Sequence, residues 1–212
     1  MTIDAVVKLG GSLLADGRLS PLLGSLGDLA RTHGVAVLPG GGLFADAVRR
    51  ACRLHDTGAS AAHWMAILAM DQHAHLLADL LPAARLVVGP QEALAAAAAG
   101  NLAVLAPFAW LRATDPLPHG WHVTSDSIAA WVAHRLEARR LVLLKAVEGV
   151  TDASGAVVPE VPLDSAALSG IVDEHFPRAV ETGLECWVLS GWHPERTAEL
   201  LRDGRTRGTR IR

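Results

Sequence analysis

The sequence Ala5-Val-Val-Lys-Leu-Gly-Gly-Ser12 places a short apolar strand directly before a glycine-rich turn. The next apolar segment, Val35-Ala-Val-Leu38, runs into Pro39-Gly-Gly-Gly42 in the same way. Ligands bind beyond the carboxyl ends of strands in open α/β sheets, and glycine lets backbone N–H groups approach a phosphate closely. Ordinary tight turns are the alternative for either cluster alone, but two clusters after consecutive strands predict a phosphate-binding edge. The Walker and Gly-x-Gly-x-x-Gly patterns do not occur, which excludes those two nucleotide motifs.

Short apolar segments alternate with longer amphipathic ones along the rest of the chain, as in a parallel sheet covered by helices on both faces. Further strands are expected at residues 86–88, 102–105, 141–144 and 186–189. Helices are expected at residues 22–32, 43–54, 59–80, 125–137 and 194–201. The pattern predicts an α/β fold, a three-layer αβα sandwich with a mostly parallel central sheet, formed by a single domain over residues 1–212.

The composition limits the classes of partner. Half of the 212 residues are apolar and 19% are charged, which predicts a packed globule rather than a disordered chain. The formal net charge of -3 provides no global basic field, so nucleic acid is not expected as a partner. Cys52 and Cys186 lie outside any Cys-x-x-Cys, which excludes a disulfide framework or zinc ribbon and fits a reducing, cytoplasmic location.

One apolar stretch, residues 93–111, approaches the length of a membrane span. Gly100-Asn101 interrupts it and Pro107 follows, so we expect a helix through Ala99, a turn and a buried strand instead. At the amino end, Asp4 and Lys8 interrupt the apolar run too early for a signal-peptide core. We therefore expect no membrane partner.

The chain has only two lysines, Lys8 and Lys145, beside seventeen arginines, and both stand at the carboxyl ends of predicted strands. The lysine ammonium is a compact point charge, whereas the arginine guanidinium is planar and forked, so the two lysines mark positions where a fork does not fit. We interpret both as phosphate partners; the alternative is that these two lysines remain by chance. The segment His122-Val-Thr-Ser-Asp-Ser127 begins a helix and offers three hydroxyls and a carboxylate, of which a cap at Ser125 or Asp126 explains only one. Spread cations and donors are what phosphoryl transfer needs.

These pieces together resemble the amino acid kinase superfamily, in that family's order and over nearly the whole chain. The segments that carry the resemblance are Lys8-x-Gly-Gly-Ser12, Pro39-Gly-Gly-Gly42, Thr124-Ser-Asp126, Lys145-x-x-x-Gly149-Val150 and Gly208-Thr-Arg-Ile211. Four more segments resemble a small branch of that family in methanofuran biosynthesis. They are His63-Trp-Met-Ala-Ile-Leu-Ala-Met-Asp71, Trp121-His-Val-Thr-Ser-Asp-Ser127, Asp173-Glu-His-Phe-Pro177 and Gly191-Trp-His-Pro-Glu-Arg196.

The resemblance implies an ATP-dependent phosphotransferase that uses Mg²⁺ with its nucleotide and forms a homo-oligomer. It implies an acceptor half over about residues 1–140 and a nucleotide half over about residues 141–212. The acceptor implied by the branch is [5-(aminomethyl)furan-3-yl]methyl phosphate, which would become its diphosphate. The alternatives are a kinase for a nucleoside monophosphate or an amino acid, and a non-catalytic nucleotide-binding or storage protein on the same fold.

The site residues are carried over by the same resemblance. Lys8, Asp126 and Lys145 are expected to be catalytic, with Arg178 as the alternative to Lys145 for the second cation. The residues expected at the phosphates and nucleotide are Gly10, Gly11, Ser12, Lys145, Glu148, Gly149, Val150 and Asp152. The residues expected at the acceptor are Gly40, Gly41, Gly42, Asp71, Thr124 and Ser125.

Asp71 and the histidines have competing interpretations. Asp71 pairs with a substrate ammonium if its helix faces the acceptor, and is otherwise a partly buried helix residue with a local partner. His73 and His75 are two residues apart on a predicted helix, so their side chains diverge and do not suggest a metal site. No metal-ligand motif is recognised, and magnesium is implied by ATP chemistry alone.

Overall fold

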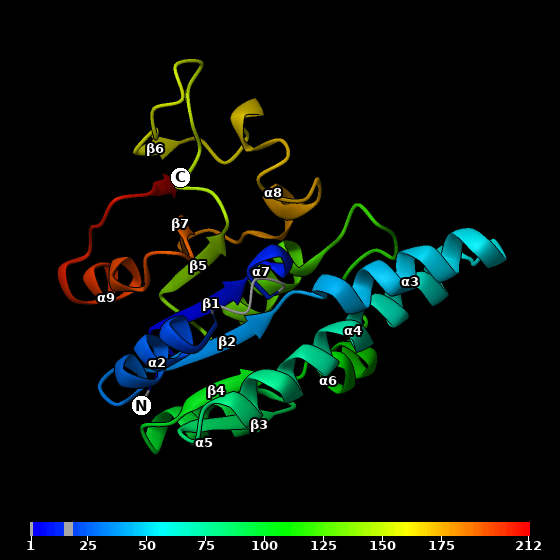
Figure 1. Cartoon of the computed structure of the whole chain (residues 1–212), viewed down its shortest axis with the longest axis horizontal. Helices are drawn as coiled ribbons and strands as arrows, with labels where there is room; N and C mark the ends of the chain where they lie inside the picture. The colour runs from blue at the N-terminus through cyan, green and yellow to red at the C-terminus, as the bar shows by residue number, and fades with distance from the viewer. Residues whose placement is uncertain (1, 15–18) are drawn as a thin grey trace.

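The computed structural model describes residues 2–14 and 19–212, and these residues form one eight-stranded sheet with helices on both faces (Figure 1). The strands are β1 (Ala5–Leu9), β2 (Val35–Pro39), β3 (Ala84–Val87), β4 (Leu102–Leu105), β5 (Arg140–Lys145), β6 (Glu160–Val161), β7 (Glu185–Ser190) and β8 (Thr209–Ile211). Their order across the sheet is β3-β4-β2-β1-β5-β7-β8-β6. All neighbouring pairs are parallel except β7 and β8, which confirms the mostly parallel sheet.

The helices pack on the two faces of this sheet. They are α1 (Gly11–Leu14), α2 (Leu19–Ala30), α3 (Gly42–His55), α4 (Ala59–Leu80), α5 (Pro90–Ala98), α6 (Phe108–Thr114), α7 (Ser125–Arg135), α8 (Phe176–Ala179) and α9 (Pro194–Asp203), with a 3₁₀ turn at Ala166–Leu168. Alternate residues of β1 separate the two apolar layers, since Val6 packs with α5 and α7 whereas Val7 packs with α2 and α9. The three-layer αβα sandwich is therefore confirmed.

Local signals placed most elements to within a few residues. The ends of α4 and β4 agree with expectation, and the apolar stretch 93–111 divides into α5, a turn at Gly100 with φ of +71°, and β4. Among the described residues, no helix is both long and apolar enough to cross a membrane. Five short helices and strands were not expected, namely α1, α6, α8, β6 and the antiparallel β8, nor was the 3₁₀ turn at Ala166–Leu168. Each is seven residues or fewer, too short for periodicity to identify.

Two features of the fold create a recess at the carboxyl edge. The carboxyl ends of β1, β2 and β5 lie side by side, because β1 pairs in parallel with both neighbours. Helix α3 begins where β2 ends, and α3 and α4 project together beyond that edge (Figure 1). The chain leaves β1 toward β2 on one side and reaches β5 on the other, so β1 lies where ligand-binding crevices form in such sheets.

Candidate active site

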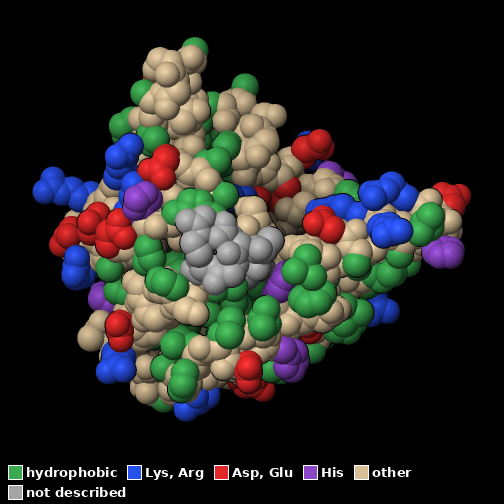
Figure 2. All heavy atoms as spheres, viewed as in Figure 1, with side chains coloured by type: hydrophobic (Ala, Val, Ile, Leu, Met, Phe, Trp, Pro, Cys, Tyr) green, Lys and Arg blue, Asp and Glu red, His purple; other side chains and the backbone are tan. Residues whose placement is uncertain are grey.

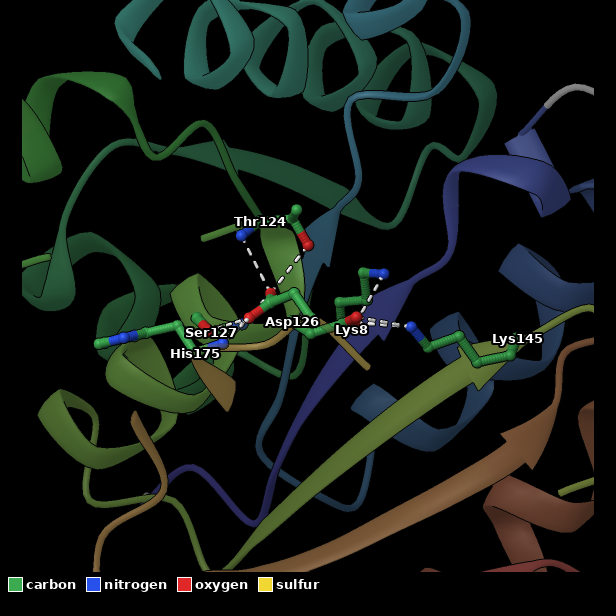
Figure 3. Close-up of polar contacts among 7 residues, drawn as sticks. Lys8, Thr124, Asp126, Ser127, Lys145 and His175 are labelled. Atoms are coloured by element: carbon green, nitrogen blue, oxygen red, sulfur yellow. Dashed lines mark hydrogen bonds and ion pairs between the residues drawn. The ribbon is translucent and has the colours of Figure 1, made fainter. Parts of the chain in front are cut away.

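Asp126 lies between the two lysines of the chain. It stands in the first turn of α7, Lys8 is near the end of β1, and Lys145 ends β5. The Oδ1 atom of Asp126 is 2.8 Å from the Nζ atom of Lys8, and its Oδ2 atom is 2.7 Å from the Nζ atom of Lys145 (Figure 3). Lys8 and Asp126 are both only 4% exposed. A carboxylate shared in this way lets two like charges lie close together in a buried place.

The burial and the charges shift the proton affinities of this triad. Burial alone would raise the pKa of Asp126, but the two ammonium groups outweigh it and hold that pKa below its ordinary value. Burial, helped by the neighbouring charge of Lys8, lowers the pKa of Lys145 to about 8, although Asp126 opposes the shift. Lys145 thus loses its charge as the pH rises through about 8, and a further anion bound beside it would move that loss to higher pH.

This shift predicts an alkaline limb in the activity profile. Because the folded pKa of Lys145 is lowered to about 8, we expect kcat/KM to fall as the pH rises through that value. kcat/KM reports groups of the free enzyme, whereas a bound phosphate favours the ammonium form, so the limb in kcat should lie at higher pH. Steady-state rates between pH 6 and 10 measure both. Lys145→Arg, which stays charged throughout, should be less active but lack the limb; an unchanged limb in that variant would contradict the assignment.

The two glycine turns touch each other beside Lys8. A Cβ atom added to Gly11 would lie 2.9 Å from the Cα atom of Gly42, and Gly42 has a φ of +45°. Side chains at these positions would push the turns apart, which explains the glycines. His73, fully buried on α4, lies beneath them, and its Nδ1 atom is 2.8 Å from the carbonyl oxygen of Gly40. A carbonyl only accepts, so Nδ1 carries the proton and donates.

Cavity 1, of about 410 Å³, opens beside these turns. It is lined by Lys8, Gly11, Ser12, Gly41, Gly42, Leu43, Ala45, Asp46, Arg49, His63, Ala66, Ile67, Met70, Gly120, Trp121, Val123, Thr124, Ser125 and Ile128. The backbone of α3 begins at its wall, which favours an anion there. Arg49 lies over the ring of Trp121, 5.0 Å from its centroid, and donates to Asp46 over 2.6 Å. The cavity thus combines apolar walls with a few charged groups, as ligand sites usually do.

Cavity 2, of about 820 Å³, lies on the other side of the triad. It is lined by Trp121, His122, Thr124, Asp126, Lys145, Ser165, Ala166, Leu168, Ser169, Gly170, Ile171, Val172, Asp173, Glu174 and Pro177. Trp121 and Thr124 line both cavities, so the two spaces adjoin at the start of α7. Asp126 and Lys145 face cavity 2, and Lys8 faces cavity 1. The triad therefore stands between two separate ligand spaces.

The structure brings together most of the predicted residues. Lys8, Gly11, Ser12, Gly41, Gly42, Thr124 and Ser125 line cavity 1, and Asp126 and Lys145 line cavity 2. Gly10 donates to the carbonyl oxygen of Leu144, and Gly40 donates to that of Leu9, so both hold the turns to the sheet. Arg178 is exposed on α8 and lines neither cavity, whereas Lys145 contacts Asp126. The geometry favours Lys145 as the second cation.

Asp71 has a local backbone partner and lies outside both cavities. Its Oδ1 atom accepts a hydrogen bond from the backbone N–H of Phe108 over 3.0 Å, at the start of α6, and it lines neither cavity. Burial raises the pKa of its carboxyl group. The alternative interpretation, a partly buried helix residue with a local partner, describes this geometry. The expected face of α4 does reach cavity 1, but through His63, Ala66, Ile67 and Met70.

Four residues of the loop after β5 that were expected at the nucleotide lie outside both cavities, as Gly10 does. Glu148 is bound by Arg196 over 2.8 Å, and the N–H of Val150 donates to the hydroxyl of Thr209. Gly149 has a φ of +155° in the same turn, and Asp152 accepts bonds within its own turn, including the N–H of Ser154. These contacts shape the loop after β5. Their role at a nucleotide stays a prediction.

Sequence reasoning missed three of the residues that shape the site. Asp46 and Arg49 recur with Gly42 and Ala45 at helical spacing on one face of α3, a signal that could have been read. His63 was noticed without a role; burial and the charge of His119 lower its pKa to about 4, so it forms an uncharged wall stacked on the His119 ring. The third missed residue, after Asp46 and Arg49, is Asp173, which is named above only within the segment Asp173-Glu-His-Phe-Pro177.

The described residues provide no ready metal cage. No group of three His, Cys, Asp or Glu side chains that could hold an ion is found among them. Both oxygens of Asp126 are engaged by lysine ammonium groups. Lys8, Lys145 and the glycine turns do fit the phosphates of a nucleotide. The use of magnesium, implied by the resemblance to ATP-dependent kinases, stays a prediction.

Comparisons with known proteins agree with this geometry. The model of the family described as "Amino acid kinase family" matches residues 5–175. The chain is 29% identical over 203 residues, 92% of each chain, to the [5-(aminomethyl)furan-3-yl]methyl phosphate kinase of Methanocaldococcus jannaschii. Its fold is similar to the uridylate kinase of Archaeoglobus fulgidus, with a TM-score of 0.77 and 21% identity over 99% of this chain and 100% of that one. It is also similar to the UMP kinase of Ureaplasma parvum, with a TM-score of 0.76 and 15% identity over 99% and 96%.

Proposed function

Because the chain belongs to the amino acid kinase family, and is therefore a kinase, we propose that it transfers the γ-phosphoryl group of ATP to a small phosphate-bearing acceptor. The observation that carries the proposal is the Lys8–Asp126–Lys145 triad between two adjoining cavities. A phosphoryl group passing between two anionic molecules needs cations on both sides of its path. This arrangement supplies them without any covalent step on the protein.

The proposed role of each residue follows from the cavity that it lines. ATP occupies cavity 2, where Lys145 meets its phosphates, and the acceptor occupies cavity 1, where the N–H groups of the glycine turns bind its anionic end. Lys8 lies where the two cavities adjoin and neutralises the charge that develops on the transferring phosphoryl group. Asp126 holds both ammonium groups in place. The magnesium ion adds positive charge at the nucleotide phosphates when it is bound.

The preferred acceptor is [5-(aminomethyl)furan-3-yl]methyl phosphate. The relative of 29% identity acts on that compound by its name. The chemistry of cavity 1 supports the choice: Ile67 and Met70 give apolar walls for a flat ring, and Arg49 adds a second cation for a phosphate. Asp46 is the carboxylate among the described lining residues, so it replaces Asp71 as the partner for an ammonium group. Uncharged His63 does not repel that ammonium.

This assignment predicts a specificity order. An acceptor without its amine should lose up to about fivefold in kcat/KM, because an ion pair with an exposed carboxylate such as Asp46 contributes about 0.2–1 kcal/mol. The measurement is ADP release with the aminomethylfuran phosphate, its des-amino analogue and uridine monophosphate. Asp46→Asn should remove the difference between the first two. Equal values in the wild-type protein would contradict recognition of the ammonium, and a better value for the nucleotide would leave a kinase with another acceptor.

Uridine monophosphate is the competing acceptor, since the two solved structures named above are a uridylate kinase and a UMP kinase. A kinase for an amino acid stays a further alternative. A non-catalytic storage protein is disfavoured because a storage site has no need for two lysines held by one buried carboxylate. ADP release with any acceptor distinguishes the kinase from the storage protein.

Three wider proposals accompany the reaction. A homo-oligomer is supported by Met65, Leu68, Leu76 and Leu80, which are exposed apolar side chains on α4. Figure 2 shows hydrophobic side chains beside the basic ones over the projecting α3–α4 pair. An acceptor half and a nucleotide half of one domain are supported by cavity 1, whose lining lies within residues 8–128. A reducing, cytoplasmic location is consistent with Cys52 and Cys186, both free and buried.

A further inference from the structure

The start of α7 depends on a carboxylate from a distant segment. Asp173 accepts hydrogen bonds at Oδ2 from the backbone N–H groups of Thr124 and Ser127, each over 3.0 Å. The hydroxyl of Thr124 donates to the same oxygen over 2.8 Å, and the hydroxyl of Ser127 donates to Oδ1 (Figure 3). The N–H of His175 also donates to Oδ1. One side chain thus joins segments 46–49 residues apart.

No residue of α7 performs this task locally. Thr124 is the N-cap, not Ser125 or Asp126 as the sequence suggested, and its own side chain makes no capping bond. Its hydroxyl is turned to Asp173 instead of accepting from the first turn. A negative charge at a helix N-terminus also interacts favourably with the free N–H groups and the helix dipole. Asp173 therefore holds the first turn of α7 from outside.

That turn carries the centre of the site. Asp126, whose carboxylate holds Lys8 and Lys145, lies between the two residues that Asp173 binds. Thr124 lines both cavities, whereas Asp173 lies in the segment Ser165–Pro177 that walls cavity 2. Movement of that segment is thereby linked, through one carboxylate, to the orientation of Asp126.

We propose that Asp173 is a positioning residue that couples the two ligand sites. Nucleotide in cavity 2 orders the Ser165–Pro177 segment, Asp173 transmits this order to Thr124 and Ser127, and the triad and the shared wall of cavity 1 become fixed. The donor therefore prepares the acceptor site. The inference rests on the proposed function for the placement of the nucleotide. The new element is the contact of Asp173 with α7, which joins the two cavities.

Hydrogen–deuterium exchange tests the link without any acceptor. The probe is adenosine 5′-(β,γ-methylene)triphosphate with Mg²⁺, and exchange is followed in peptides covering residues 120–130 and 165–177. In the wild-type protein, we expect the probe to slow exchange in both peptides by about tenfold or more. This is the size of effect expected when hydrogen bonds to a charged group become more stable. In Asp173→Ala, only the 165–177 peptide should respond. Asp173→Asn keeps one oxygen toward Thr124 but loses the charge and one acceptor, so its response at 120–130 should be clearly smaller than that of the wild type and larger than that of Asp173→Ala.

Asp4→Ala is the matched control. Asp4 is also a half-buried carboxylate that accepts a backbone N–H, from Gly34, but it stands at the opposite end of β1. Its exchange response should equal that of the wild type. If Asp173→Ala does not fold, Asp173→Asn alone decides: a response at 120–130 identical to wild type, in a variant with weakened unliganded protection there, overturns the coupling.

The outcomes separate the two proposals. Protection of 165–177 with no change at 120–130 in the wild type overturns the coupling and leaves the kinase assignment intact. Equal protection at 120–130 in wild type and Asp173→Ala does the same. No protection of 165–177 in the wild type overturns the proposed donor site and the coupling with it.

Discussion

Asp126→Asn is expected to lower turnover by about 10²–10³-fold while leaving the chain folded, the range seen when one preorganised charge-stabilising group is removed. The carboxylate lies 2.8 Å from the ammonium of Lys8 and 2.7 Å from that of Lys145. A neutral carboxamide cannot compensate two buried cations, and its NH₂ group faces one of them. Lys145, whose pKa is already lowered to about 8, then loses its proton more readily.

Steady-state kinetics and thermal unfolding of the same preparation test this expectation. The alkaline limb of kcat/KM should move to lower pH in Asp126→Asn, a change that a purely structural defect does not produce. Asp4→Asn supplies the control, since Asp4 is a partly buried carboxylate far from the triad along β1. Activity within threefold of wild type for Asp126→Asn would show that the shared carboxylate is not needed to organise the lysines.

Lys8→Ala should also reduce turnover by about 10²–10³-fold, the loss expected for a donor that acts in the transition state. Lys8 is 4% exposed and lines cavity 1 beside Gly11 and Ser12, so its ammonium faces the space in which the acceptor phosphate is proposed to lie. The acceptor KM should change less than kcat. Asp126 keeps Lys145 as a partner in this variant, and the buried carboxylate is therefore not left alone.

Lys8→Met separates the loss of charge from the loss of volume. Arg140→Met is its counterpart, because Arg140 is likewise 4% exposed and pairs with a carboxylate, Glu185, over 3.0 Å at the start of β5. Both variants break a buried ion pair on the same sheet, so both should lower the melting temperature. Only Lys8→Met should abolish most turnover. Similar rates for the two variants would assign Lys8 to stability rather than to catalysis.

Local patterns predicted the parts of the site that follow strands directly. The glycine turns and both lysines were expected at carboxyl strand ends, and the structure places Gly11 against Gly42 and both lysines on Asp126. This succeeds because parallel strands bring their carboxyl ends to one edge whatever the lengths of the connecting helices. The same reasoning could not choose between the two interpretations of Asp71, since a position on a helix does not reveal whether a cavity or a neighbouring backbone N–H lies opposite.

The αβα sandwich, the two glycine turns and the place of both lysines at carboxyl strand ends followed from the sequence alone, whereas the ion pairs of both lysines with Asp126 came from the tertiary structure. Apolar periodicity and glycine turns are local signals, and the sheet converts them into a shared edge. Only the tertiary structure decided that Asp46 and Arg49 line cavity 1 and that Asp173 supports α7. The bonds of Asp173 join residues 46–49 positions apart, and no local preference encodes such a contact, because it exists only after the sheet and helices have packed.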